Sequence, residues 1–158
     1  MSHTSETDQQ VTAQGKMAAL AKGGAAMTTP RILLADDQEE MLQTLVEMLE
    51  GEFQIVGTAG NGMRVLELTL RLAPDIVVLD ISMPVLNGFQ AALRLKEQCS
   101  AARVVFLTAH EDTDLVEAGM SAGALGYVVK SCLATDLVPA LWQALAGKTF
   151  VSPSLSNP

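Results

Sequence analysis

Strand-like and helix-like apolar patterns alternate five times between residues 31 and 147, and this alternation limits the chain to very few folds. The strand-like runs span residues 31–35, 52–59, 75–80, 103–108 and 124–130. The helix-like runs span residues 38–51, 62–73, 86–98, 112–123 and 135–147. Regular alternation of this kind is typical of α/β domains, in which helices cover both faces of a parallel sheet.

The strand-like runs are nearly continuous stretches of apolar residues, which is typical of strands that are buried on both faces. Parallel strands need right-handed crossovers, so few strand orders remain. We predict an α/β fold with a doubly wound, five-stranded parallel sheet of order 2-1-3-4-5, the flavodoxin-like arrangement. In such a sheet the functional site lies beyond the carboxyl ends of the strands, where the winding reverses.

The two ends of the chain differ from this central pattern. Residues 1–29 are rich in Ser, Thr, Gln, Ala and Gly and contain little that could form a core, so we expect a disordered N-terminal arm. We assign residues 30–150 to the α/β domain and residues 151–158 to a C-terminal tail or a truncated linker. Three candidate starts stay open, namely Met1, Met17 and Met27.

The composition excludes several classes of protein. The net charge of -8 argues against a nucleic-acid surface on this portion of the chain, which would carry a basic patch. Cys99 and Cys132 are too few for a disulfide framework, so we expect two reduced thiols. No apolar run approaches the roughly 18 residues of a membrane span, and the N-terminus lacks a signal-peptide pattern. We therefore expect a cytoplasmic protein without membrane contact.

Polar residues stand at the carboxyl ends of four strand-like runs. They are Asp36 and Asp37 after the first run, Asp80 at the end of the third, Thr108 at the end of the fourth and Lys130 at the end of the fifth. The carboxyl ends of parallel strands lie at one edge of a sheet, and the first and third strands are neighbours in the predicted order. Three carboxylates are therefore expected in one crevice.

Such a cluster of carboxylates is unfavourable unless something offsets its charge. Two like charges about 4 Å apart repel by roughly 4 kcal/mol at an effective dielectric constant near 20. Either one carboxylate stays protonated or a cation binds, and hard oxygen ligands suit Mg²⁺. A carboxylate can attack phosphorus to form an aspartyl phosphate. With Lys130 and Thr108 beside it, Asp80 is the candidate nucleophile for this chemistry.

The residues at the strand ends resemble those of the response-regulator receiver domains of bacterial two-component systems. The matching segments are Asp36-Asp37, Asp80 in "VVLDISMPVLNG", Thr108 in "FLTAH" and Lys130 in "GYVVKS". The resemblance covers the chain from about Pro30 to Pro153, and "GALGYVVKS" and "ALAGKTFVSP" are similar to receivers of the NarL/FixJ type. Five separated positions match in order and strand context, so the resemblance is specific.

The resemblance implies a role for each of these residues. Asp80 would be the phosphoacceptor, and Thr108 and Lys130 would contact the phosphoryl group. Asp37 would bind Mg²⁺ directly and Asp36 mostly through water. Asp80 and the backbone carbonyl of Ser82 would complete the metal site.

Three further positions are implied to act in signalling. Tyr127 matches an aromatic switch whose rotamer follows the position of Thr108, although its sequence pattern is equally that of a core residue. Ser82 and His110 match positions that tune the lifetime of the phosphoryl group. Two departures stand out: Ser131 replaces a proline common after the lysine, and Pro139 is expected to delay or bend the last helix.

The resemblance also implies the partners. A sensor histidine kinase would phosphorylate Asp80, and the phosphorylated state would change a partner surface or form a homodimer. Receivers of this type normally regulate transcription through a helix-turn-helix domain, which is absent from this sequence, either truncated or never present. The kinase, the stimulus and the lifetime of the phosphorylated state stay open.

We expect no enzymatic turnover of a substrate, and two other functions remain as alternatives. A phosphatase working through an aspartyl phosphate usually has a second aspartate two residues after the nucleophile, where this chain has Ser82. A binding scaffold that has lost phosphorylation would not need the intact set of polar residues at the strand ends.

Overall fold

The computed structural model describes residues 29–98, 100–111 and 113–156. By its contacts the chain divides between Pro30 and Arg31 into two units, and the second unit contains all the helices and strands described below. The arm expected over residues 1–29 lies, apart from Thr29, outside the described residues. Cys99 also lies outside them, whereas Cys132 is a free thiol.

The second unit is built on a parallel sheet of order β2-β1-β3-β4-β5-β6. Its strands are β1 (Arg31–Ala35), β2 (Gln54–Ala59), β3 (Ile76–Asp80), β4 (Arg103–Thr108), β5 (Gly126–Val129) and β6 (Phe150–Val151). The predicted doubly wound α/β fold and the order of the first five strands are confirmed.

The prediction of five strands is corrected by β6, which pairs in parallel with β5. This strand contains only Phe150 and Val151, both half-buried. Two residues are too few to show the apolar pattern that identifies a strand, so the sequence could not distinguish this strand from an irregular tail. The stretch that follows β6 is also ordered against the sheet, since Ser152 is fully buried.

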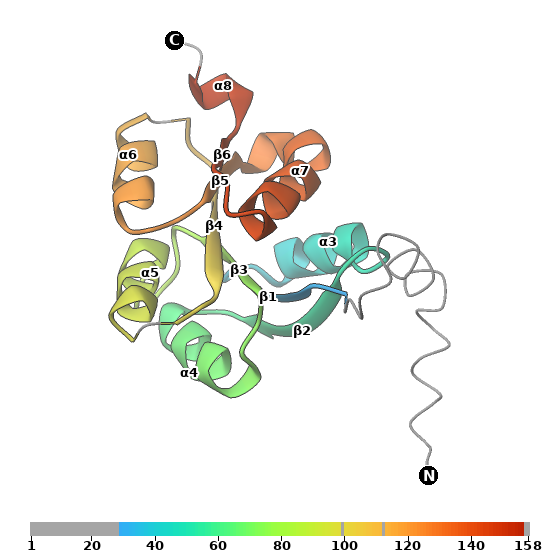
Figure 1. Cartoon of the computed structure of the whole chain (residues 1–158), viewed down its shortest axis with the longest axis vertical. Coiled ribbons are helices and arrows are strands. Elements are labelled where there is room, and N and C mark those ends of the chain that lie inside the picture. Colours follow the sequence, from blue (N-terminus) through green and yellow to red (C-terminus); the bar gives the residue numbers. More distant parts are fainter. Residues whose placement is uncertain (1–28, 99, 112, 157–158) are drawn as a thin grey trace. The chain divides into compact units, whose positions relative to one another are not determined.

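Helices cover both faces of the sheet (Figure 1). They are α3 (Glu39–Leu49), α4 (Gly62–Leu72), α5 (Gly88–Glu97), α6 (Thr113–Ser121), α7 (Leu133–Leu145) and α8 (Pro153–Ser156), with a 3₁₀ turn, η1, at Lys130–Cys132. Helices α4, α5 and α6 lie on one face and α3 and α7 on the other. No helix in the described part of the chain is both long and apolar enough to span a membrane.

Successive strand residues point to opposite faces of the sheet, and this divides the core into two clusters. Leu33, Val77 and Phe106 belong to the cluster under α4, α5 and α6. Leu34 and Val78 belong to the cluster under α3 and α7. Both sets are fully buried, which explains why the strands appear in the sequence as continuous apolar runs.

Local capping sets the starts of α4 and α5. The Asn61 side chain accepts a hydrogen bond from the Arg64 amide at the start of α4, and Asn87 and Gln90 form a capping box at the start of α5. Helix α7 begins at Leu133 and continues through Pro139. The expected delay at Pro139 is therefore wrong, because the helix begins at Leu133, six residues before the proline.

Candidate functional site at the carboxyl edge of the sheet

The carboxyl ends of β1 and β3 bring three acidic side chains together. One carboxylate oxygen from each of Asp36, Asp37 and Asp80 lies within 4.8 Å of the others. Asp36 and Asp80 are buried and Asp37 is exposed. The prediction that three carboxylates share one crevice is confirmed.

Lys130 lies beside two of these carboxylates. Its ammonium Nζ is 2.8 Å from Asp36 Oδ2 and 3.2 Å from Asp80 Oδ1. The other oxygen of Asp36, Oδ1, accepts a hydrogen bond of 2.8 Å from the Gln38 amide just before α3. Asp36 is therefore held both by the start of a helix and by the lysine that follows β5.

The buried charges of the site shift two pKa values. Burial, followed by repulsion from Asp36, raises the pKa of Asp80 above its usual value of 3.8, although Lys130 acts in the opposite direction. Burial alone would lower the pKa of Lys130. The hydrogen bond to Asp36 and the charges of Asp80 and Asp36 outweigh burial and raise the pKa of Lys130 above its usual value of 10.5.

The loop after Asp80 is tightly folded against the end of β3. The Gly88 amide donates to the Ile81 carbonyl at 2.9 Å, which closes the loop at its base. At its tip the Leu86 amide donates to the Pro84 carbonyl at 2.7 Å around Val85, whose φ of 71° is strained for a β-branched residue. Val85 is exposed, whereas Leu86 is buried and anchors the loop.

Thr108, at the end of β4, is buried with its hydroxyl engaged by the backbone. Its Oγ1 accepts a hydrogen bond of 3.0 Å from the His110 amide. A hydroxyl that accepts in this way keeps its own proton available for donation. The Ser82 amide donates to Asp80 Oδ1 over a long 3.4 Å.

Tyr127 lies in β5 and is fully buried. Its ring centroid lies 6.1 Å from that of Phe106, at a steep angle of 64°. Gly119 of α6 faces the same two rings, since a Cβ there would lie 3.1 Å from Tyr127 and 3.0 Å from Phe106. The ring of Tyr127 therefore occupies space that a glycine on α6 leaves open.

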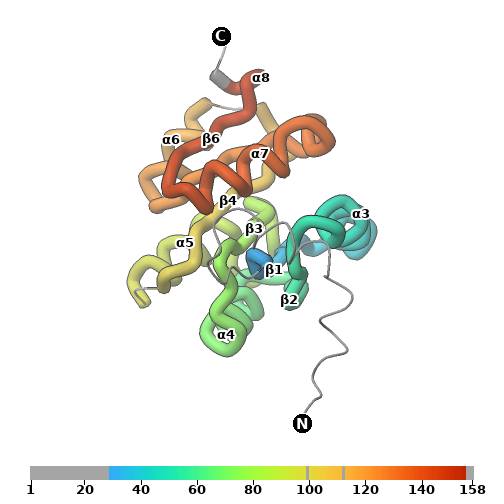
Figure 2. Tube along the Cα trace, turned by 45° about the vertical axis from the view of Figure 1, so that its right-hand side comes forward, coloured from blue at the N-terminus to red at the C-terminus, as the bar shows by residue number. Residues whose placement is uncertain are grey.

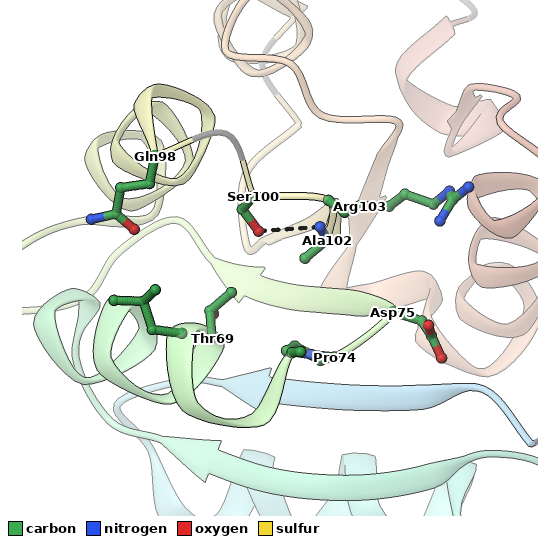
Figure 3. Close-up of a pocket in the computed structure, with 10 residues that line it drawn as sticks. Thr69, Pro74, Asp75, Gln98, Ser100, Ala102 and Arg103 are labelled. Carbon is green, nitrogen blue, oxygen red and sulfur yellow. Dashed lines mark hydrogen bonds between the residues drawn. The ribbon is translucent and has the colours of Figure 1, made fainter.

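One hollow of the described residues lies away from this site. A cavity of about 370 Å³ opens at the opposite edge of the sheet, where β3 and β4 begin (Figure 3). It is lined by residues at the end of α4 and from both strand starts, among them Thr69, Pro74, Asp75 and Arg103. Asp80 and Thr108 lie at the other ends of these two strands, so the cavity is separate from the acidic site.

The sheet order and the acidic crevice with its lysine define a doubly wound α/β domain with a charged site at the switch point of its winding. A comparison with protein families agrees, because the response regulator receiver domain matches residues 32–141. This chain therefore belongs to the response regulator receiver domain family.

Bacterial relatives share this region. The transcriptional regulatory protein PdtaR of Mycobacterium tuberculosis H37Rv is 39% identical over 117 residues, which are 73% of this chain and 57% of the relative. The nitrate/nitrite response regulator protein NarL of Escherichia coli K12 is 37% identical over 131 residues, 80% of this chain and 60% of the relative. The chain spans less than two thirds of the length of either relative.

Solved structures show the same architecture. A two-component response regulator of the LuxR family from Aurantimonas sp. SI85-9A1 has a TM-score of 0.78 at 30% identity, covering 82% of this chain and 94% of the other. The signal receiver domain of the putative response regulator NarL from Mycobacterium tuberculosis has a TM-score of 0.74 at 28% identity, covering 77% and 100%. The predicted resemblance to NarL-type receivers is confirmed.

The sequence reasoning missed two buried polar side chains at the end of β5, the strand that leads into Lys130. Asp136 of α7 and Ser152 after β6 are both buried, and a hydrogen bond of 2.7 Å joins them. Ser152 falls within the predicted C-terminal tail, and Asp136 falls within the last predicted helix. A signal was present in "VSP", where a serine precedes a proline directly after an apolar pair, as helix N-caps do.

Proposed function

We propose that this chain is a phosphorylatable receiver of a two-component phosphorelay, in which Asp80 accepts a phosphoryl group from a phosphohistidine of a sensor histidine kinase. The observation that carries the proposal is the position of the Lys130 ammonium, 3.2 Å from Asp80 and 2.8 Å from Asp36. A lysine between two buried carboxylates at the carboxyl edge of the sheet matches the needs of phosphoryl transfer.

The transfer makes one bond and breaks one. An oxygen of the Asp80 carboxylate forms a bond to phosphorus while the bond from phosphorus to the imidazole nitrogen of the donor breaks, and that nitrogen keeps the bonding pair. The product is an acyl phosphate on Asp80. The Lys130 ammonium can stabilise the negative charge of the phosphoryl oxygens. The Thr108 hydroxyl still has its proton and can donate a hydrogen bond to one of these oxygens.

The donor set fits a divalent cation. Asp36, Asp37 and Asp80 offer carboxylate oxygens within 4.8 Å of one another, and the Ser82 carbonyl is the fourth candidate ligand. These are hard oxygens, which suit Mg²⁺. Mg²⁺ bound there would neutralise negative charge on the carboxylates and on the phosphoryl group.

The signal would leave the site through Thr108 and Tyr127. Movement of Thr108 toward a phosphoryl group would break its contact with the His110 amide and free space beside β5. The buried Tyr127 ring lies against α6, so a shift in that space reaches the surface formed by α6, β5 and α7. We assign Ser82 and His110, which border the site, to tuning the lifetime of the phosphoryl group.

The outputs we propose are a changed partner surface or a homodimer in the cytoplasm. A role in transcription would be exerted by a segment outside this chain, since PdtaR and NarL are regulators longer than the region that matches. We propose no direct contact between this portion and nucleic acid, because its net charge is -8.

Incubation with Mg²⁺ and a small phosphodonor such as acetyl phosphate, followed by intact mass measurement, tests the proposal. The wild-type chain is expected to gain one phosphoryl mass, which chelation of Mg²⁺ prevents. Asp80→Asn is expected to gain none. An equal gain by the variant would place the acceptor elsewhere, and no gain by the wild type would favour a scaffold that has lost phosphorylation.

The absence of enzymatic turnover stays a prediction. The residue two positions after Asp80 is the exposed Ser82, which cannot act as the acid that a phosphatase uses to protonate its leaving group. Steady hydrolysis of an aryl phosphate over many turnovers per chain would contradict this prediction.

A further inference from the structure

A buried hydrogen-bond network joins the end of β5 to the segment after β6. The Ser152 hydroxyl accepts from the Val129 amide at 3.0 Å and donates to Asp136 Oδ2 at 2.7 Å. The other oxygen of Asp136, Oδ1, accepts from Thr135 at 3.0 Å. Both Ser152 and Asp136 are buried, so the two bonds made by the Ser152 hydroxyl are shielded from water.

The serine side chain takes over where the sheet ladder stops. The Phe150 amide donates to the Leu125 carbonyl and the Ser152 amide to the Tyr127 carbonyl, which is the regular parallel pattern. The next acceptor in this pattern would be the Ser152 carbonyl, but that group accepts from the Leu155 amide as the chain turns into α8. The Ser152 hydroxyl therefore supplies the acceptor for Val129.

Val129 is the residue before Lys130, and the chain turns between them. Val129 has extended backbone angles of φ -80° and ψ 134°, and Lys130 begins the 3₁₀ turn η1. The last extended amide thus sets the point and direction from which the lysine side chain leaves the sheet. On its other side β5 is held by β4, where Val129 pairs with Thr108.

We propose that Ser152 and Asp136 are positioning residues for Lys130 in the phosphorylation of Asp80, an inference that rests on the function proposed above. Asp136 orients the Ser152 hydroxyl, and the hydroxyl fixes the Val129 amide. The Lys130 ammonium is thereby held where it meets Asp36 and Asp80.

This arrangement couples the site to the C-terminal segment of the chain. Strand β6 and helix α8 lie beside α7 and α6 in both views of the fold (Figures 1 and 2). Leu155 of α8 is buried in the same cluster as Tyr127. Because coupling between two equilibria is reciprocal, a partner that lifts the segment from Val129 would disfavour the occupied site, and an occupied site would strengthen the docking of the segment.

The test compares the rate of Asp80 phosphorylation by acetyl phosphate in three variants of the full chain. Ser152→Ala removes the hydroxyl, and Ser152→Thr keeps it. Val104→Ala is the matched control, because it removes buried apolar atoms at the far end of β4. We expect Ser152→Ala to lower the maximal rate about 5- to 20-fold at saturating phosphodonor, with Mg²⁺ dependence unchanged, since a small displacement of a catalytic group has an effect of this order.

Two further measurements separate positioning from mere stability. Ser152→Thr is expected to restore most of the rate, and Val104→Ala to lower stability without lowering the rate. In a Lys130→Gln background, Ser152→Ala is expected to change the rate by less than about twofold, because its effect acts through the lysine. If Ser152→Ala does not fold, Asp136→Asn replaces it in the double-mutant cycle with Lys130→Gln. We expect Asp136→Asn to lower the phosphorylation rate about 2- to 5-fold in the wild-type background and to have no effect in the Lys130→Gln background.

The inference is overturned if Ser152→Ala matches Val104→Ala in rate, or if it has an undiminished effect in the Lys130→Gln background. Hydrogen exchange of the Val129 amide is measured without any phosphodonor, and we expect it to be at least about tenfold faster in Ser152→Ala than in the wild type. A wild type that takes no phosphoryl group would defeat the proposed function. Equal exchange of Val129 in both chains would defeat the positioning inference separately.

Discussion

Gly88 of α5 lies against the backbone of Asp80, so closely that a Cβ at position 88 would be 2.5 Å from the Asp80 carbonyl oxygen. The same Cβ would be 2.9 Å from the Cα of Ile81. The start of α5 therefore supports the strand end from which the candidate phosphoacceptor projects. Only a residue without a side chain fits there, which explains the Asn87-Gly88 pair that closes the loop.

Gly88→Ala is expected to destabilise the fold by about 2–4 kcal/mol, because the new methyl group meets backbone that cannot move away as a flexible side chain could. It is also expected to slow phosphorylation of Asp80 by shifting the end of β3. Denaturant unfolding and the acetyl phosphate rate measure the two effects. Gly51→Ala is the control, since no atom lies within 4 Å of a Cβ there. A Gly88→Ala variant as stable as Gly51→Ala would show that the loop tolerates a side chain.

Asp80→Asn is expected to raise stability at neutral pH in the absence of metal. The pKa of Asp80 is raised in the folded chain, so between the usual value of 3.8 and the raised value the folded state binds more protons than the unfolded state. Stability therefore falls as the pH rises through this window, and the penalty is complete above it. The advantage of Asp80→Asn should be largest at pH 7 and shrink as the pH falls toward 3.8. An advantage that grows on acidification would contradict the direction of the pKa shift.

Asp37→Asn is expected to remove most of the stabilisation that Mg²⁺ gives the wild type. A ligand present at ten times its Kd adds about 1.4 kcal/mol to the stability of a chain that binds it only when folded. Without Mg²⁺ the free energy of unfolding of the variant should lie within about 0.5 kcal/mol of the wild-type value, because Asp37 is exposed. Thermal unfolding with Mg²⁺ and with a chelator measures both. Glu47→Gln, at an exposed position in the last turn of α3, should keep the full response to Mg²⁺.

Gly119→Ala is expected to displace the ring of Tyr127 from its buried position. The added Cβ would lie 3.1 Å from that ring and 3.0 Å from Phe106. Crowding of this kind costs about 1–3 kcal/mol, and the better helix propensity of alanine offsets up to about 1 kcal/mol of it. Ring chemical shifts of Tyr127 by NMR report the displacement. Unchanged shifts in the variant would show that the helix moves instead of the ring.

The sequence predicted the alternation of strands and helices because the two kinds of element space their apolar residues differently. Buried parallel strands are continuous apolar runs, whereas amphipathic helices repeat apolar residues every three or four positions. It also predicted the meeting of Asp36, Asp37, Asp80 and Lys130, because the topology places all strand carboxyl ends at one edge. Such a prediction needs only the order of the strands. It does not need the positions of individual side chains.

The parts that could not be predicted depend on contacts between distant segments. Strand β6 is too short to show a period, and it forms only because β5 offers a free edge. The network of Ser152 with Asp136 and Val129 joins β5, α7 and the residue between β6 and α8, and no local sequence pattern records that these segments meet. The need for glycine at positions 88 and 119 likewise follows from backbone and rings that approach from other elements.

The most direct test of the account is to find the residue that carries the phosphoryl group. The wild-type chain is incubated with acetyl phosphate and Mg²⁺, the acyl phosphate is reduced with borohydride, and the resulting homoserine is located by peptide mass spectrometry. We predict homoserine at position 80 alone. Homoserine at position 36 or 37 would contradict the assignment of Asp80 as the phosphoacceptor, and the same yield without Mg²⁺ would contradict the role proposed for the metal.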